Sequence, residues 1–509
     1  MPLRSPRSST LRELIGSGAD DQPAITAPGA TPLKYSALRT MVEQTVATLN
    51  AFGVGRDDRV AIVLPNGPDM ATTFIGVASA ATAAPLNPSY KADEFEFYMS
   101  DLKAKALVVE TGSTSPAIDV ARRLGIKIVT LHPDHAQGAG YFSLECDDRS
   151  GSCRAGHAEA DDIALILHTS GTTSRPKIVP LTQRNVCTSA GNIAETLAFD
   201  TTDCGLNIMP LFHIHGLIAG VLAPLSAGGR VFCTPGFNAL RFFAWMDEAK
   251  PTWYTAVPTM HQAILTRASG NREIIARHPL RFIRSSSSSM PPQVIAEVEN
   301  TFGAPLIEAY GMTEASHQMA SNPLRGMRKP GSVGLAAGPE VAIMDDTGAL
   351  LQSGEIGEIV IRGANVTCGY ENNPAANASA FTDGWFRTGD QGTIDHEGYI
   401  SLTGRLKEII NRGGEKISPR EVDEVLMDHP AVQQVVVFAM PHEKLGEEVA
   451  AAVVLREGTS GDEKELRDFC SQRLASFKVP RKIVFLDKIP LGATGKLQRI
   501  GLAEKLGLA

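Results

Sequence analysis

The residues from 169 to 177 constrain this chain more than any other segment, because their composition suits the binding of a polyphosphate. They read Thr-Ser-Gly-Thr-Thr-Ser-Arg-Pro-Lys. Glycine and small hydroxyl residues let backbone N–H groups approach an anion closely, and Lys177 adds a positive charge. The apolar run 163–167 predicts a buried strand before the loop, and a helical pattern begins near Thr182. We therefore expect a phosphate-binding loop at a strand-to-helix junction, although ordinary polar surface turns share this composition.

The loop is not of the Walker type. A Walker loop requires a second glycine directly before its lysine and a serine or threonine directly after it. Here Pro176 precedes Lys177, and Ile178 follows it. The prediction is therefore a nucleotide-binding loop of another class.

Length and charge indicate a large globular protein without a nucleic-acid partner. The chain has 509 residues, 43% of them hydrophobic, and a formal net charge of −8. At about 150 residues per domain, roughly three domain-sized units are expected. The negative balance argues against nucleic-acid binding, and no apolar run reaches the ~18 residues that span a bilayer. The seven cysteines are scattered without paired spacing, so we expect reduced thiols in a cytoplasmic protein, with no expectation for its oligomeric state.

Short apolar runs alternate with helical patterns along the first part of the chain. Strands are predicted at 60–64, 106–109, 126–129 and 163–167, and helices at 36–52 and 69–81. This alternation predicts an α/β fold, with parallel sheets covered by helices. From about residue 341, shorter strands and turns predict a small antiparallel, barrel-like subdomain. A last α+β unit is predicted from a helix at 418–428, strands at 432–439 and 449–455, and a helix ending at 474.

Five further motifs follow the loop in a fixed order. They are Pro210–Gly216, Glu308–Glu314, Trp385–Asp390, Gly404–Lys416 and Gly492–Arg499. Together with the loop they resemble the acyl-adenylate-forming superfamily, which contains acyl-CoA synthetases, peptide-synthetase adenylation domains and luciferases. Six blocks in one order are far more specific than any one of them.

Details within these motifs resemble the oxalate–CoA ligase branch of that superfamily. The resemblance lies in segments 168–177, 212–215 and 312–323. Ser174 stands where most members of the superfamily have glycine, and Ser289 stands where many have proline. Both differences resemble traits of the branch.

The resemblance implies how the chain is divided. We expect an N-terminal adenylate-forming domain over 1–403, a hinge over 404–407 and a mobile C-terminal domain over 408–509. Lys407 resembles the hinge residue about which the small domain swings between two half-reactions. In the first, an acid and ATP form an acyl-adenylate and pyrophosphate. In the second, the thiol of CoA displaces AMP.

The resemblance also implies a site for ATP and Mg²⁺. Glu314 resembles the carboxylate that holds the metal, which proteins usually bind through one or two carboxylates plus phosphate oxygens. Asp390 resembles the acceptor of both ribose hydroxyls, and Arg405 resembles a cationic fork on ribose or phosphate. Tyr310 resembles the ring that stacks on adenine, with a packed core tyrosine as the alternative. The predicted nucleotide-binding residues are Thr169, Ser170, Gly171, Thr172, Thr173, Ser174, Arg175, Lys177, Glu308, Ala309, Tyr310, Gly311, Met312, Thr313, Asp390 and Arg405.

The acid site is expected around the serine run 285–289. In the family this position wraps adenine and the acyl pocket, and a flexible polar turn is the alternative. Five hydroxyls would line a fatty chain poorly and a small dianion well. His213 resembles the residue between the acyl pocket and the thiol tunnel, and on an extended segment His215 would share its face. The predicted acid-binding residues are His213, Ser287, Ser289, His317 and Lys496.

The remaining predicted roles concern CoA and catalysis. Gly413 and Gly414 resemble the loop along which the pantetheine arm of CoA passes, where a side chain would collide with it, and Lys416 follows them. Lys496 resembles the lysine that enters the site for adenylation. The predicted catalytic residues are Lys496, His213 and Glu314. A small polar acid, with oxalate as first choice, is expected as substrate. A fatty acyl-CoA synthetase or a carrier-protein-loading enzyme is the alternative.

Overall fold

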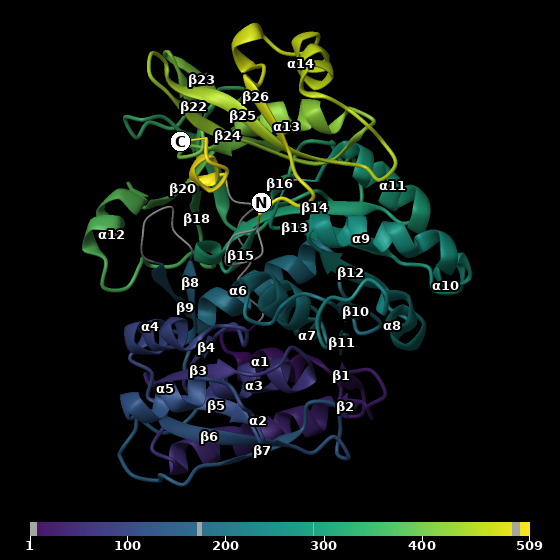
Figure 1. The fold of residues 1–509 in the computed structure, drawn as a ribbon. Coiled ribbons are helices and arrows are strands. Elements are labelled where there is room, and N and C mark those ends of the chain that lie inside the picture. The colour runs from purple at the N-terminus through teal and green to yellow at the C-terminus, as the bar shows by residue number, and fades with distance from the viewer. Residues whose placement is uncertain (1–7, 170–175, 289, 491–498, 509) are drawn as a thin grey trace. The chain divides into compact units, whose positions relative to one another are not determined.

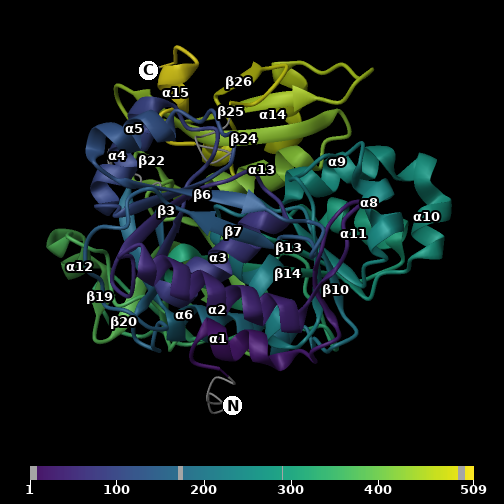
Figure 2. The same cartoon turned by 90° about the horizontal axis from the view of Figure 1, so that it is seen from below.

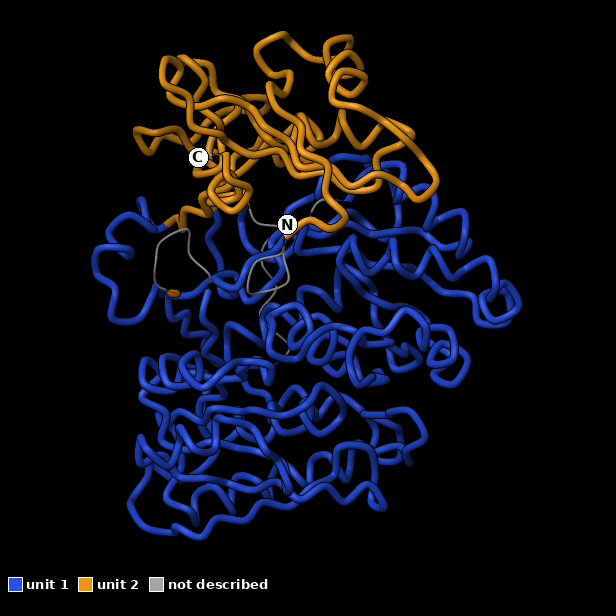
Figure 3. The backbone as a smooth tube through the Cα atoms, in the orientation of Figure 1, with its two compact units in different colours: residues 1–169, 177–341, 361–384 blue, residues 170–176, 342–360, 385–509 orange. Residues whose placement is uncertain are grey.

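A computed structural model describes residues 8–169, 176–288, 290–490 and 499–508 of the chain (Figure 1). The chain forms two compact units (Figure 3). Unit 1 comprises residues 1–169, 177–341 and 361–384, and unit 2 comprises 170–176, 342–360 and 385–509. The division at 403 and 407 expected from the sequence stays a prediction.

The first sheet of unit 1 has seven strands in the order β7-β6-β5-β3-β4-β8-β9. Its inner strands run parallel, and antiparallel pairs close both edges. The strands are β3 (Arg59–Val63), β4 (Thr82–Pro85), β5 (Ala106–Glu110), β6 (Lys127–Pro133), β7 (Phe142–Glu145), β8 (Ile163–Thr169) and β9 (Lys177–Thr182). The helices along this part are α1 (Leu11–Leu14), α2 (Tyr35–Ala51), α3 (Pro68–Ala80), α4 (Ala92–Leu102) and α5 (Ala117–Leu124).

Apolar residues explain why these elements form and pack. Strand β5 is buried along nearly its whole length, as expected for a parallel strand covered on both faces. Helix α4 buries Phe95, Met99 and Leu102, whose spacing places them on one side of the helix. They join Leu107 and Val109 of β5 in one apolar cluster. The predicted α/β alternation is confirmed. β3 begins and ends one residue before the strand predicted at 60–64, and β5 ends one residue after the strand predicted at 106–109.

The second sheet of unit 1 has nine strands in the order β16-β15-β14-β13-β12-β10-β11-β1-β2. Its strands are β1 (Pro23–Thr26), β2 (Leu33–Lys34), β10 (Cys204–Asn207), β11 (Arg230–Cys233), β12 (Trp253–Ala256), β13 (Phe282–Ser286), β14 (Leu306–Met312), β15 (His317–Ser321) and β16 (Leu335–Ala336). Strands β10 to β14 are parallel, so their carboxyl ends meet at one edge. This edge carries the serine run.

Helices α8 (Phe242–Ala249), α9 (Pro258–Ala268), α10 (Arg272–Arg277) and α11 (Pro292–Phe302) group together beside this sheet (Figures 1 and 2). Their apolar side chains pack with those of the parallel strands in a single cluster. Helix α6 (Gln183–Thr196), a π-helix over His215–Leu222 and α7 (Ala223–Ser226) lie in contact with one another. The π-helix leads directly into α7.

The exit of the phosphate loop differs from the sequence prediction. Residues 177–182 do not lead straight into a helix but form β9, which pairs antiparallel with β8. The loop therefore connects two strands of a hairpin, and α6 begins only at Gln183, capped by the Thr182 side chain. The β-branched pair Ile178 and Val179 favours a strand. Pro180 is tolerated because β9 is the edge of its sheet.

Unit 2 holds the smaller sheets that the change of pattern near residue 341 predicted. In the first, β20 (Trp385–Ile394) pairs antiparallel with β21 (Ile400–Arg405), and β18 (Gly357–Arg362) lies between β17 (Glu340–Met344) and β20. The second contains β22 (Ile410–Arg412), β23 (Glu415–Ile417), β24 (Val432–His442), β25 (Gly446–Leu455) and β26 (Lys482–Phe485). Its helices are α13 (Pro419–Met427), α14 (Glu463–Ser471) and α15 (Leu502–Lys505), so the predicted α+β unit is confirmed.

Within the described ranges, no helix has both the length and the apolar character needed to cross a membrane. All seven cysteines are free thiols, and five of them are buried.

Candidate active site

Glu314 is a buried carboxylate at the end of β14. It lies in a short 3₁₀ turn (Thr313–Ala315), and 6% of its surface is exposed. The Tyr370 hydroxyl donates a hydrogen bond to Glu314 Oε1 at 2.9 Å. Burial, with the nearby charge of Glu314, raises the pKa of Tyr370 well above its usual value, so this hydroxyl stays a donor. The carboxylate is therefore held in one orientation by a neutral partner.

Lys177, the first residue of β9, approaches the same tyrosine. Its Nζ lies 4.1 Å from the centroid of the Tyr370 ring, which is a cation–π distance. Two hydrogen bonds to backbone carbonyls hold β9 against the segment around Tyr370. The Glu371 N–H donates to Ile178 O at 3.1 Å, and Thr367 Oγ1 donates to Pro180 O at 2.8 Å. Tyr370 thus joins two groups that the sequence singled out separately. Sequence reasoning missed Tyr370, which belongs to none of the motifs used.

The surroundings of Glu314 bear on its predicted role as a metal ligand. No group of three or more His, Cys, Asp or Glu side chains within the described ranges is arranged to hold a metal ion. Mg²⁺ bound with a nucleotide needs only one or two carboxylates, because phosphate oxygens and waters complete its shell. A single buried carboxylate therefore fits that mode of binding. Ser170 to Arg175, Ser289 and Lys496 lie outside the described residues.

The predicted adenine segment is strand β14. Glu308, Ala309 and Tyr310 are buried within it, between β13 and β15. A Cβ atom on Gly311 would lie 1.8 Å from the carbonyl oxygen of His317, so only glycine fits where β14 and β15 approach. The segment's backbone is thereby fixed beside His317. Its contacts with adenine stay a prediction.

The carboxyl ends of β12 and β13 and the amino end of β15 bring together a polar cluster around His215. This histidine is 2% exposed and begins the π-helix. Its Nδ1 lies 3.0 Å from Ser287 Oγ, and its Nε2 lies 2.7 Å from Thr255 Oγ1. The ring of His317 stacks on it, with the centroids 4.8 Å apart. Two of the predicted acid-binding residues, Ser287 and His317, therefore lie around one histidine that was not among them.

Arg284 is a third group that sequence reasoning missed, after Tyr370 and His215. It is fully buried, and its Nη1 lies 3.3 Å from His215 Nε2. Its Nη2 donates to Gln318 Oε1 at 3.3 Å, and its Nε has no hydrogen-bond partner within the described ranges. Burial lowers the pKa of the Arg284 guanidinium to about 9. The only sign of this role in the sequence is an arginine in the apolar run before the serines.

His213 occupies a different environment from His215. Residues 211–213 form a turn and bend, and a helix begins at 214, so the two histidines do not share a strand face. His213 is partly exposed, and its ring packs against Phe212 with centroids 4.6 Å apart. The buried cluster therefore contains His215, while a role for His213 between acid and thiol stays a prediction.

Two predicted nucleotide contacts meet in unit 2. Asp390 on β20 lies opposite Arg405 on β21, and Arg405 Nε lies 3.1 Å from Asp390 Oδ1. Asp390 is buried, whereas the Arg405 side chain is 59% exposed. Because the guanidinium of Arg405 is exposed, it can move away from Asp390 and bind a ligand instead. The antiparallel register therefore explains why motifs separated along the chain place these two side chains together.

The predicted CoA loop is the tip of the β22–β23 hairpin. Gly413 and Gly414 have φ values of +56° and +97°, a region that favours glycine. Nothing lies within 4 Å of a Cβ built on Gly414, so backbone conformation rather than crowding requires glycine there. Lys416 and Lys407 are both exposed. The passage of CoA and the hinge at Lys407 stay predictions.

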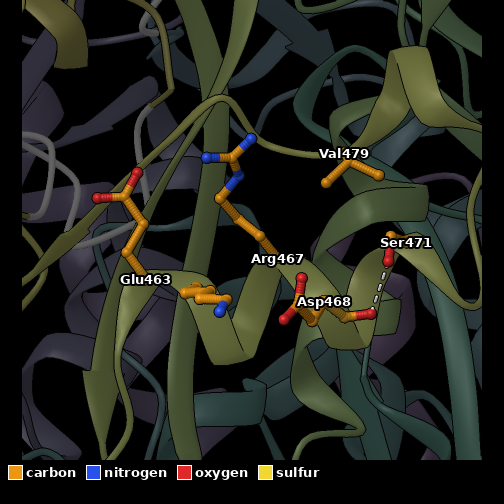
Figure 4. Close-up of a pocket in the computed structure, with 6 residues that line it drawn as sticks. Glu463, Arg467, Asp468, Ser471 and Val479 are labelled. Carbon is orange, nitrogen blue, oxygen red and sulfur yellow. Dashed lines mark hydrogen bonds between the residues drawn. The ribbon is translucent and has the colours of Figure 1, made fainter.

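A hollow beside α14 contains none of the residues predicted from the sequence. Figure 4 shows side chains that line it, including Glu463, Arg467, Asp468 and Val479. Ser471 Oγ donates to the backbone carbonyl of Asp468 at 2.8 Å. The lining is mostly charged and does not resemble an acid- or nucleotide-binding pocket.

Comparison with known proteins places the chain in a family. The family described as AMP-binding enzyme matches residues 16–371, and the AMP-binding enzyme C-terminal domain matches residues 421–496. An oxalate–CoA ligase of Arabidopsis thaliana is 45% identical over 504 residues, 97% of this chain and 98% of the relative. An oxalate–CoA ligase of Saccharomyces cerevisiae is 43% identical over 481 residues, 89% of this chain and 87% of the relative.

A solved structure agrees with these similarities. ATP-bound MatB from Rhodopseudomonas palustris matches the fold with a TM-score of 0.88 and 29% identity, over 98% of each chain. The likeness therefore covers nearly the whole length of both chains. The chain belongs to the AMP-binding enzyme family and is an acid–thiol ligase, as its ordered motifs predict.

Proposed function

We propose that the protein joins oxalate to CoA using ATP, through an oxalyl-adenylate, with AMP and pyrophosphate as by-products. The similarity to two oxalate–CoA ligases over most of the chain supports this choice. The observation that carries it is the polar cluster of His215, Ser287 and His317, which offers polar groups where a fatty chain would need apolar ones.

In the first half-reaction, a carboxylate oxygen of oxalate attacks the α-phosphorus of ATP. A new P–O bond forms, and the bond to pyrophosphate breaks. We assign to residues Thr169 to Lys177 and to Lys496 the stabilisation of the negative charge on the phosphoryl oxygens. Glu314, oriented by the Tyr370 hydroxyl, would hold Mg²⁺. When bound, this ion neutralises phosphate charge as a Lewis acid.

In the second half-reaction, the thiol of CoA attacks the carbonyl carbon of the adenylate, and AMP leaves. The C-terminal domain is proposed to swing about Lys407, withdrawing Lys496 and presenting the hairpin tip. The left-handed conformations of Gly413 and Gly414 support this role, because a tip without side chains leaves room for the pantetheine arm.

The choice of acid leaves a second carboxylate to be accommodated. Burying an unpaired carboxylate costs several kcal/mol even after relaxation, so the site must offer it donors or positive charge. His317, Ser289 and His213 are assigned this task, with His317 as the first candidate. A fatty acyl-CoA synthetase is the alternative function, and its substrate would offer these groups no second carboxylate to bind.

Product analysis tests the reaction directly. The purified protein is incubated with ATP, Mg²⁺, CoA and one acid from a panel of carboxylic acids, and the nucleotides are separated by chromatography. We expect AMP and pyrophosphate with oxalate, and no turnover when the acid is omitted. ADP and phosphate as products would contradict adenylate chemistry, and AMP formation only with other acids would contradict the assignment of oxalate.

A further inference from the structure

Three side chains from different parts of unit 1 meet the ring of His215. Thr255 comes from β12, Arg284 from β13, and Ser287 from the turn that follows β13. Thr255 and Arg284 lie opposite each other in the parallel register, so both reach the same ring nitrogen, Nε2. Ser287 lies against the other nitrogen, Nδ1.

The chemistry of these partners determines where the ring carries its proton. A guanidinium has only donors, so His215 Nε2 must accept from Arg284 and cannot carry hydrogen. Thr255 then also donates to Nε2. A neutral imidazole with a bare Nε2 has its hydrogen on Nδ1 and donates it to Ser287 Oγ at 3.0 Å.

This arrangement leaves the Ser287 hydroxyl with a defined role. Its oxygen accepts from His215, so its own hydrogen is available to a further acceptor. Ser287 is partly exposed, unlike the other members of the chain of hydrogen bonds. Its backbone has a φ of +73°, which is rare outside glycine and accompanies functional sites when the surroundings enforce it. The serine is thus a donor at the outer end of the series.

Arg284 at the inner end carries a charge without a counter-ion. It makes no ion pair within the described ranges, although it is fully buried. Two hydrogen bonds to neutral groups, at 3.3 Å each, offset only part of the cost of burying a cation. A protein gains little from such an arginine unless an anion binds nearby. The hydrogen-bond series ends on a donor, which is the group that an anion requires.

We propose that Arg284, Thr255 and His215 are positioning residues that orient the Ser287 hydroxyl as the donor to the distal carboxylate of the acid. This series of hydrogen bonds, from Arg284 and Thr255 through His215 to Ser287, is called the relay below. It rests on the proposed function, since it assumes a substrate with two carboxylates. It deepens that function by assigning the selection of a dianion to the relay, while His317 stacks on the relay histidine. Arg284 supplies a positive charge next to His215, and His215 fixes the direction of the Ser287 hydroxyl through its own hydrogen bond.

Paired measurements of affinity and stability test the relay. Acid-dependent ATP–pyrophosphate exchange gives the KM for oxalate and for ATP, and calorimetry gives the binding of oxalate alone. Ser287→Ala and Arg284→Met should each raise the oxalate KM by about tenfold to a hundredfold, as loss of a charged hydrogen bond does, with the ATP KM little changed. Arg284→Lys keeps the positive charge, so its oxalate KM should lie between that of the parent and that of Arg284→Met.

Arg281 provides a matched control just before β13. It forms two bonds to buried Asp203, at 2.8 and 3.1 Å, so its charge is already neutralised. Arg281→Met should lower the melting temperature and leave the oxalate KM unchanged. Arg284→Met should be at least as stable as the parent, because it removes an uncompensated buried charge. A merely structural arginine would show the reverse, with lower stability and unchanged oxalate KM.

The outcomes separate the relay from the proposed function. If the parent shows no exchange with oxalate, the proposed function fails. If the parent uses oxalate but Ser287→Ala leaves its KM and binding unchanged, the relay is wrong. Should Arg284→Met fail to fold, the stability argument is overturned, and Ser287→Ala alone decides the donor role.

Discussion

The Tyr370 hydroxyl donates to Glu314 Oε1 at 2.9 Å while the Tyr370 ring lies 4.1 Å from Lys177 Nζ. One tyrosine therefore touches both the carboxylate proposed to hold Mg²⁺ and the lysine of the phosphate loop. Its ring and its hydroxyl serve different partners, so the two contributions can be separated by removing a single oxygen atom.

Tyr370→Phe should reduce kcat/KM for MgATP by about tenfold to a hundredfold, the range for loss of one hydrogen bond to a charged group. The ring contact with Lys177 is retained, so the loss should appear as a higher Mg²⁺ requirement. Titration of Mg²⁺ at fixed ATP measures it. Tyr141→Phe is the control, because that hydroxyl binds the exposed Gln44 side chain. Equal Mg²⁺ dependence in parent and Tyr370→Phe would show that Glu314 needs no such orientation.

Lys496→Ala should abolish adenylation and leave thioester formation from supplied acyl-adenylate much less affected. The reason is that Lys496 is proposed to act in only one of the two conformations. ATP–pyrophosphate exchange measures the first step, and release of AMP from the adenylate in the presence of CoA measures the second. Equal losses in both assays would contradict separate conformations.

Gly414→Leu should have the opposite effect. A leucine would be strained at a φ of +97° and would fill the space proposed for the pantetheine arm. Exchange driven by acid should survive, and the CoA step should be blocked. Gly458→Leu, at a φ of +77° in another turn of unit 2, controls for strain alone. A block of both steps by Gly414→Leu would argue for misfolding rather than for a CoA path.

Oxalate should exceed octanoate in kcat/KM by more than about 10³, because a site built to hydrogen-bond a substrate rejects an analogue that lacks the group. His317→Ala should mainly impair the use of oxalate. Rates of AMP formation with each acid measure both effects. A preference for octanoate would identify a fatty acyl-CoA synthetase and leave the adenylation chemistry intact.

His261 should make the protein acid-sensitive. It is fully buried, and burial lowers its pKa to about 3, whereas an unfolded chain binds its proton near 6.5. Between these values the unfolded state holds more protons, so stability falls as the pH drops from about 6.5 toward 3, by up to about 1.4 kcal/mol per pH unit. His261→Gln lacks this titration, so its melting temperature should fall less than the parent's from pH 7 to pH 5. Parallel melting curves across that range would refute the assignment.

The sequence predicted those features that local patterns determine. Apolar runs marked β3 and β5, and ordered motifs marked the family. The exit of the phosphate loop was predicted wrongly, because Ile178 and Val179 form too short a run to reveal a strand, and their pairing with β8 is set at a distance. Periodicity alone cannot report such pairing.

The side chains around the site were harder to predict, for a physical reason. Tyr370 meets Glu314 across 56 residues of sequence, and Arg284 meets His215 across 69. Neither contact follows from local spacing, because each depends on the order of strands in a sheet. His215 carries the same chemistry as His213, and only the fold shows which of them is buried. The predicted roles of Ser170 to Arg175, Ser289 and Lys496 stay predictions.

His215 begins a π-helix, in which each turn holds one residue more than an α-turn. If residues 215–222 formed an ordinary α-helix of the same length instead, the wider turns would be lost and His215 would be rotated about the helix axis relative to α7, away from Thr255 and Ser287. The hydrogen-bonding pattern of this segment therefore sets where the histidine lies. A substitution in 216–222 that restored α-helical hydrogen bonds would displace His215 although every residue in contact with it stayed the same.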